Sequence, residues 1–124
     1  MGKLMKNILW FKELGIEDVP KVGGKNASLG EMYNNLVSRG VNIPNGFATT
    51  AEAYFNFLEF GGIKHQIAEI IKGLDVHNLK SLQKKGKEVR NLILGAELPE
   101  ELKKDIVSAY NELSGFYNES EADV

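Results

Sequence analysis

The stretch that decides the fold runs Val22-Gly23-Gly24-Lys25-Asn26-Ala27-Ser28-Leu29-Gly30-Glu31-Met32. Two adjacent glycines come directly before a lysine, and apolar residues at helical spacing follow. Glycine allows backbone conformations and close approaches that a side chain would block. The first turn of a helix offers unpaired N–H groups and the positive end of the helix dipole. This combination predicts a phosphate site, with Lys25 as a mobile positive charge and Gly23 and Gly24 as backbone donors.

The apolar spacing after Lys25 predicts a helix from Asn26 to Arg39, which Gly40 ends. Two starting points remain open. A capping box of Ser28 and Glu31 would start the helix after Lys25. Alternatively, the helix starts near Gly24, and Ser28 lies inside it.

A second block follows at once and reads Gly40-Val41-Asn42-Ile43-Pro44-Asn45-Gly46-Phe47-Ala48-Thr49-Thr50. Its Pro-Asn-Gly segment is typical of a turn, and residues 47–49 suit a short strand. Thr49 and Glu52 have the spacing of a capping box, which predicts a further helix that ends at Gly61-Gly62.

The rest of the chain adds one strand and three helices. Residues 8–11 predict the strand, and residues 14–20 a connecting loop with room for one helical turn, in which Pro20 stops any preceding helix. A short helix is expected over residues 63–74, another capped by Asn78, and a last one with Pro99 at its first position. About five helices and two or three short strands predict a helix-rich α+β fold. So few strands make no stable sheet alone, so we expect them to belong to a larger sheet in a longer protein.

Composition narrows the classes of function. The 124 residues are 43% hydrophobic, carry a net charge of −2 and include no cysteine. This composition argues against nucleic-acid binding through a broad basic field, and it excludes disulfides and thiolate metal sites. The longest apolar runs are too short to cross a membrane, so we expect no membrane partner and a cytoplasmic location.

In this order and at this spacing, the two blocks resemble the N-terminal part of the phosphoenolpyruvate synthase and pyruvate phosphate dikinase family. Trp10-Phe11 with Leu14 also looks like the start of that family. The resemblance covers residues 8–60, and the helical part, residues 61–118, carries no motif. It implies that residues 1–124 are a single partial domain, the N-terminal portion of an ATP-grasp nucleotide-binding domain.

The resemblance also implies an activity. In this family ATP phosphorylates a histidine on a separate mobile domain, and the phosphate then moves to pyruvate to give phosphoenolpyruvate. The family's phosphate-binding lysine corresponds to Lys25, and Thr50 is expected to line the nucleotide site. A second cationic segment, the Mg²⁺ ligands and the phosphohistidine domain are expected beyond Val124. The implied partners are therefore ATP, Mg²⁺ and the remaining domains. We expect no catalytic residue and no metal ligand in this chain, so the chain alone should be inactive.

Other nucleotide motifs do not fit. A P-loop needs glycine and a hydroxyl residue where this chain has Val19 and Asn26, and the dinucleotide fingerprint lacks its first glycine. Two alternatives remain: a stand-alone helical module that binds an anion or a protein without catalysis, and a regulatory or defective paralogue.

Three further features have structural explanations. His65 and His77 have no metal-ligand spacing, and the resemblance places the phosphohistidine in another domain. The basic run that begins at Lys80 suits a solvated helix face. A helix with apolar residues all around it (Tyr54, Phe55, Phe57, Leu58 and Phe60) predicts a surface open to self-association if the parent's other parts are missing.

Overall fold

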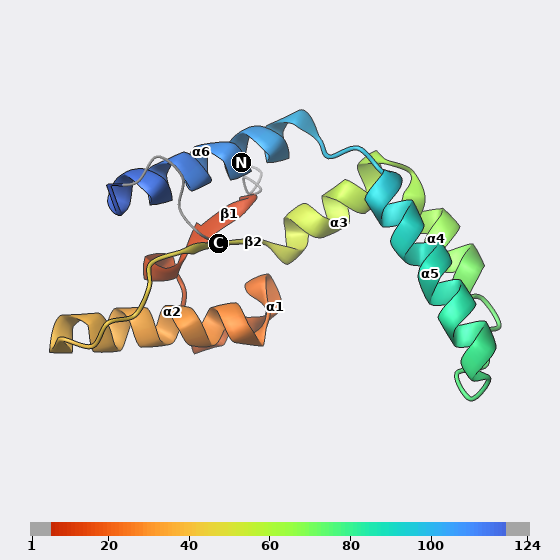
Figure 1. Ribbon diagram of the computed structural model, residues 1–124, viewed down its shortest axis with the longest axis horizontal. Coiled ribbons are helices and arrows are strands. Elements are labelled where there is room, and N and C mark those ends of the chain that lie inside the picture. Colours follow the sequence, from red (N-terminus) through yellow and green to blue (C-terminus); the bar gives the residue numbers. More distant parts are fainter. Residues whose placement is uncertain (1–5, 119–124) are drawn as a thin grey trace, which may run out of the picture. The chain divides into compact units, whose positions relative to one another are not determined.

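Two short antiparallel strands organise the first part of the molecule. A computed structural model describes residues 6–118 (Figure 1). Strands β1 (Ile8–Trp10) and β2 (Phe47–Thr49) pair so that Leu9 lies opposite Ala48. With the helices α2 (Gly24–Leu36) and α6 (Glu100–Phe116) they belong to a unit formed by residues 6–54 and 100–118. In Figure 1 the strands lie between these two helices.

The chain between β1 and α2 consists of tight turns. Two 3-10 helices (Phe11–Glu13 and Ile16–Asp18) lead into the short α1 (Val19–Val22). Pro20 is the second residue of α1, where its missing N–H costs nothing. The expected loop over residues 14–20 therefore contains helical turns, and Pro20 lies inside one.

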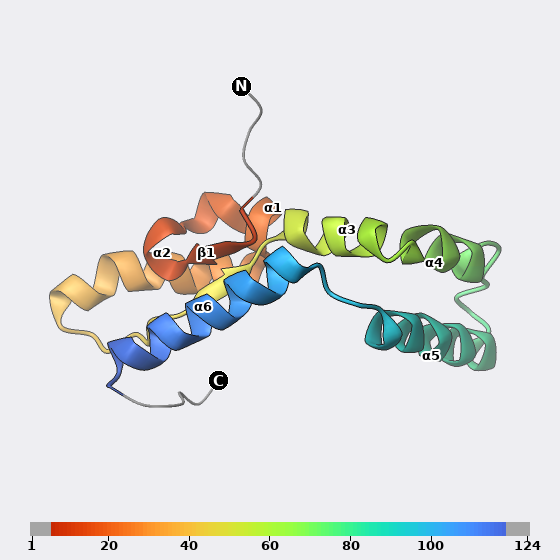
Figure 2. The same ribbon diagram turned by 90° about the horizontal axis from the view of Figure 1, so that it is seen from above.

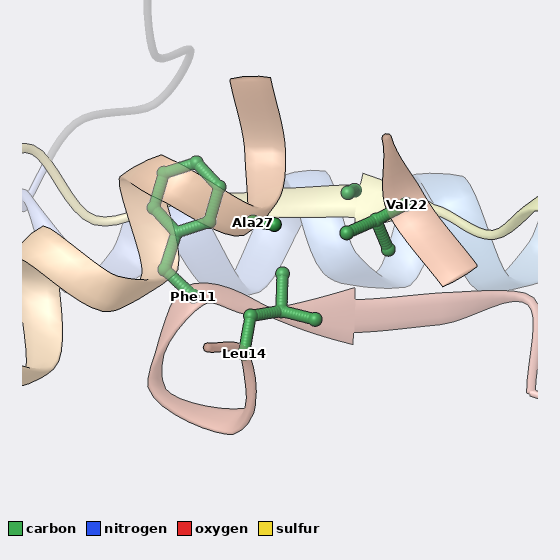
Figure 3. Packing of buried hydrophobic residues seen from close by; sticks show 5 residues of the cluster. Phe11, Leu14, Val22 and Ala27 are labelled. Atoms are coloured by element: carbon green, nitrogen blue, oxygen red, sulfur yellow. The ribbon is translucent and has the colours of Figure 1, made fainter. Parts of the chain in front are cut away.

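The core of this unit forms where these turns meet α2 and β2. Figure 3 shows the packing of its buried side chains, four of which it labels: Phe11, Leu14, Val22 and Ala27. Ala48 of β2 is also buried in this core, and the partly buried Leu9, Leu29 and Tyr33 pack against it. The two blocks of the sequence thus share one core with the segment around Trp10 and Leu14.

The second unit, residues 55–99, is a helical hairpin. The end of α3 (Ala51–Phe60) leads through Gly61-Gly62 into α4 (Ile63–Ile71), which packs against α5 (Leu79–Gly95). Both ribbon views show α4 and α5 side by side (Figure 2). Asn78 caps α5 as predicted, since its side chain accepts a hydrogen bond from the N–H of Ser81 at 3.2 Å.

The helix-rich α+β fold is confirmed, and the described residues contain the two paired strands and six α-helices, one of them the four-residue α1. The membership of the strands in a larger sheet stays a prediction, as does the division into a motif-bearing part, residues 8–60, and a helical part, residues 61–118.

Several predicted boundaries are wrong by small amounts. Helix α2 begins at Gly24, which confirms the second starting point and rules out a cap by Ser28. Phe11 leaves the strand and turns into the core, and Pro99 comes just before α6 rather than inside it. Thr49 does not cap α3: the Oγ1 of Thr50 accepts the hydrogen bond from the N–H of Ala53, at 3.0 Å.

Candidate phosphate-binding helix start

The junction between α1 and α2 is made by Gly23. Its φ is +84° and its ψ 165°, a conformation that favours glycine. Its N–H donates to the carbonyl of Val19 at 2.8 Å, and its own carbonyl accepts from the N–H of Ala27 at 3.1 Å. Gly23 therefore ends α1 and starts α2 without a spacer. No side chain caps this end of α2, so the N–H groups of its first turn have no acceptor within the helix.

Lys25 lies in the first turn of α2 and is exposed. No hydrogen bond or ion pair joins its ammonium group to another residue of the described part, 6–118. The space beside the glycines is also open, since a Cβ added to Gly23 or Gly24 would meet no atom within 4 Å. The structure thus brings together an unpaired cation, two unobstructed glycines and an uncapped helix start.

A hollow lies beside α1, and Lys25 does not line it. It has a volume of about 550 Å³. Its wall combines the start of α3 with residues of β1, the first 3-10 helix, α1 and the chain before β1: Lys6, Leu9, Glu13, Pro20, Lys21, Thr50, Ala51 and Glu52. Lys6 and Lys21 are cations that the sequence reasoning missed. Lys21 comes four residues before Lys25, but Gly23 separates their two helices, so helical spacing could not have signalled it.

Thr50 does line this hollow, but its hydroxyl group is already engaged. It donates to the carbonyl of Lys6 at 2.7 Å while it accepts from Ala53, and the residue is 6% exposed. A hydroxyl has a single hydrogen atom, so Thr50 has none left for a nucleotide. Its role in lining a nucleotide site stays a prediction.

Asp18 fixes the turn before α1. Its carboxylate accepts the N–H of Gly15 at 2.9 Å and lies 3.3 Å from the ammonium nitrogen of Lys21. The hydrogen bond from Gly15 is the main reason that the pKa of Asp18 lies below its ordinary value; burial opposes the shift and Lys21 adds to it. The same contact holds Lys21 at the hollow.

Two other glycines of the quoted blocks serve packing. A Cβ on Gly30 would lie 2.4 Å from the Cβ of Leu14, and a Cβ on Gly46 would lie 2.7 Å from the ring of Phe11. Asn34, also on α2, donates its amide to the carbonyls of Leu14 at 2.8 Å and Phe11 at 3.1 Å. Both blocks therefore pack against the same turn after β1.

The histidines form no site in the part of the chain that the structure describes. His65 is exposed on α4, and the backbone N–H of His77 donates to Asp75 at 2.9 Å. Within residues 6–118 no three His, Cys, Asp or Glu side chains come together as metal ligands. Over the same residues, no helix is both long and apolar enough to cross a lipid bilayer.

The fold and this site define a helix-rich α+β domain in which α2 starts at a pair of glycines followed by a lysine. The profile of one family, pyruvate phosphate dikinase, AMP/ATP-binding domain, matches residues 19–124. The chain belongs to this family. The match includes the helical residues beyond 60, so the kinship extends further than the two blocks indicated.

Curated relatives agree with this membership. Phosphoenolpyruvate synthase of Aquifex aeolicus is 47% identical over 117 residues, which are 94% of this chain and 14% of the relative. The proteins of the same name from Helicobacter pylori and Escherichia coli are each 45% identical, over 97% and 86% of this chain. These matches cover 15% and 14% of the two relatives. The chain therefore spans only about a seventh of the length of these proteins.

Proposed function

We propose that this chain supplies the N-terminal part of the ATP-binding domain of an enzyme that makes phosphoenolpyruvate from pyruvate. The observation that carries the proposal is the family match, which begins at Val19 and so includes the Gly23-Gly24-Lys25 helix start. The name of the relatives, phosphoenolpyruvate synthase, supports phosphoenolpyruvate as the product. Family membership favours this proposal over a stand-alone anion-binding or interaction module.

Lys25 is the proposed phosphate ligand. Phosphoryl transfer depends mainly on positioning and on neutralising the charge of the phosphates. An exposed, unpaired ammonium at an uncapped helix start can supply both a point charge and nearby N–H donors. The N–H of Gly23 is donated to the carbonyl of Val19, so Gly24 is the proposed backbone donor, and neither glycine blocks the approach of a phosphate. Thr50 is proposed to line the nucleotide site through the adjoining hollow.

Other components of the reaction are proposed to lie outside these residues. Mg²⁺, when bound, would neutralise part of the phosphate charge, but residues 6–118 offer no set of three ligands for it. The histidine that accepts the phosphate, an ATP-grasp continuation of the domain and the pyruvate site belong to the same proposal. The same proposal includes a cytoplasmic location and a role in gluconeogenesis. It also includes contact between the exposed aromatic residues of α3 and either the remaining domains or a second copy of the chain.

Residues 1–124 alone should bind ATP weakly or not at all and should not turn over, because they match only about a seventh of the relatives' length. Titration calorimetry with ATP and Mg²⁺ measures this directly. Tight, magnesium-dependent binding by residues 1–124 would contradict the proposal that this segment holds only part of the site.

The role of Lys25 is tested in a chimera. Residues 6–118 replace the matching segment of Aquifex aeolicus phosphoenolpyruvate synthase, and transfer of labelled phosphate from ATP to the enzyme is followed. We expect Lys25→Ala to slow phosphoenzyme formation by about 100-fold, the usual effect of removing one group that stabilises transition-state charge. Lys104→Ala, on the exposed side of α6, is the matched control and should leave the rate unchanged. An equal rate in both variants would remove Lys25 from the reaction.

A further inference from the structure

The loop before β2 brings together two groups that can react with each other. Asn45 is the single asparagine of this sequence that a glycine follows. The backbone N–H of Gly46 donates to the side-chain oxygen Oδ1 of Asn45 at 2.9 Å. That oxygen is bonded to the amide carbon Cγ, so the nitrogen of Gly46 lies close to an electrophilic carbon. A bond between these two atoms closes a five-membered ring, and groups held in contact in this way react much faster than separate ones.

Gly46 suits the role of the nucleophile in this reaction. A glycine carries no Cβ that would crowd the ring as it closes. The core requires a glycine at this position for a separate reason, since a Cβ on Gly46 would lie 2.7 Å from the ring of Phe11. The packing of the loop against the turn after β1 therefore keeps the reactive pair in the chain.

The side-chain nitrogen of Asn45, Nδ2, is not held in place by the fold. Within residues 6–118 this nitrogen makes no hydrogen bond, and Asn45 is only half-buried, so the loop is open to water. The asparagines at the buried side of α2 differ. The Nδ2 of Asn26 donates to the carbonyl of Val22, and that of Asn34 donates to two carbonyls. Asn45 thus combines a nucleophile in contact with a leaving group that nothing retains.

We propose that Asn45 is a site of self-modification, with Gly46 as the nucleophile and water as the second reactant. The nitrogen of Gly46 forms a bond to Cγ of Asn45, the bond from Cγ to Nδ2 breaks, and ammonia leaves with the proton that Gly46 gives up. Water then opens the resulting succinimide at one of its two carbonyl carbons. Opening at Cγ gives aspartate at position 45. Opening at the backbone carbonyl gives isoaspartate, whose main chain runs through the former side chain.

The two products have different consequences for the fold. The N–H of Asn45 donates to the hydroxyl oxygen of Tyr117 at 2.7 Å, and the carbonyl of Gly46 accepts from the N–H of Phe11 at 3.0 Å. Aspartate keeps the main chain between these two hydrogen bonds unchanged. Isoaspartate adds one carbon atom to it, so the two hydrogen bonds no longer fit together. Tyr117 is 42% exposed whereas Phe11 is buried, so isoaspartate breaks the contact with Tyr117 at the end of α6.

The test follows the full chain during incubation in neutral buffer. Mass spectrometry of its peptides measures the conversion of each asparagine, and a synthetic peptide with the sequence of residues 41–50 is the unfolded reference. We expect Asn45 to convert no more slowly in the folded chain than in the peptide, and at least about tenfold faster than any other asparagine. Asn45→Gln should abolish the conversion, because the longer side chain would have to close a six-membered ring. The matched control, Asn42→Gln in the same loop, should leave it unchanged.

Three results would overturn the proposal. The first is slower conversion of Asn45 in the folded chain than in the peptide, which would show that the fold blocks ring closure. The second is another asparagine that converts as fast as Asn45. The third concerns the aspartate and isoaspartate forms, which ion exchange separates. We expect the isoaspartate form to unfold at a lower urea concentration, and Tyr117→Phe to destabilise only the aspartate form. Equal unfolding of the two forms would contradict the loss of the contact with Tyr117.

Discussion

Gly30 is the residue at which α2 touches the turn after β1. Its neighbour across that contact, Leu14, is 2% exposed, and its carbonyl lies 2.8 Å from the place where a Cβ on Gly30 would be. Leu14 is also held by the amide group of Asn34. The close approach leaves no room for any side chain at position 30, and the neighbouring backbone cannot give way without breaking the contact.

We therefore expect Gly30→Ala to lower the free energy of unfolding by about 2 kcal/mol, the usual cost of overpacking a tight core contact. The fluorescence of Trp10, the single tryptophan, reports urea unfolding of this unit. Gly115→Ala on α6 is the matched control: its Cβ would meet nothing within 4 Å, so stability should stay equal or rise by about 0.5 kcal/mol. Equal stability of the two variants would show that α2 can move away from Leu14 at no cost.

The sequence predicted the importance of the glycine pair but not the different roles of the glycines. Gly23 is needed for its positive φ, which the passage from α1 into α2 requires. Gly30 and Gly46 are needed for packing against residues distant in the chain. No local pattern distinguishes these cases, because the clash at Gly30 depends on where Leu14 lies in the folded molecule.

At the scale of elements, the capping-box rule predicts that Thr49 caps α3, but the adjacent Thr50 does so in the structure. Thr49 ends β2 and is exposed, whereas Thr50 follows the strand, is buried and caps α3. The sequence predicted the helix and the kind of cap but chose the wrong threonine. The pairing of β2 with β1 decides between them, since it brings the hydroxyl of Thr50 to the carbonyl of Lys6 and to the first turn of α3.

Thr50→Val should therefore lower the free energy of unfolding by about 1–2 kcal/mol, because α3 loses its cap and a second hydrogen bond while the side chain keeps its shape. Thr49→Val is the matched control and should change stability by less than about 0.5 kcal/mol. Urea titration of both variants measures the difference. A larger loss for Thr49→Val would restore the sequence-based capping box.

The turn between Gly15 and Asp18 predicts a dependence on pH. The pKa of the Asp18 carboxyl group is lowered below 3.8 in the folded chain, mainly by the N–H of Gly15. The ionised carboxylate therefore stabilises the folded chain fully at pH values above the pKa that Asp18 has in the unfolded chain. This stabilisation is lost as the pH falls through the pKa that Asp18 has in the folded chain. NMR titration of the Asp18 side chain should give the lower pKa, and Asp18→Asn should flatten the fall in stability at acid pH. A pKa at or above 3.8 would contradict the described hydrogen bond.

At the scale of the whole molecule, the sequence predicted the family, the α+β class and most of the helices. It did not predict the division of contacts into two units, because that division depends on α6 returning to β1, where Asp105 accepts a hydrogen bond from the side chain of Asn7 at 2.8 Å. It also did not predict the hollow beside α1, whose wall gathers residues from four separate segments. Such long-range arrangements leave no periodic signal in a single sequence.

The most direct measurement of the central claim is the reactivity of the Lys25 amine. In the chimeric enzyme, acetylation of individual lysines is timed by mass spectrometry with and without saturating ATP. A nucleotide phosphate at the start of α2 would shield Lys25, so its acetylation should slow in proportion to the fraction of enzyme that holds ATP, while Lys104 reacts at an unchanged rate. If Lys25 reacts equally fast with and without bound ATP, its ammonium group does not contact the nucleotide and the central claim is wrong.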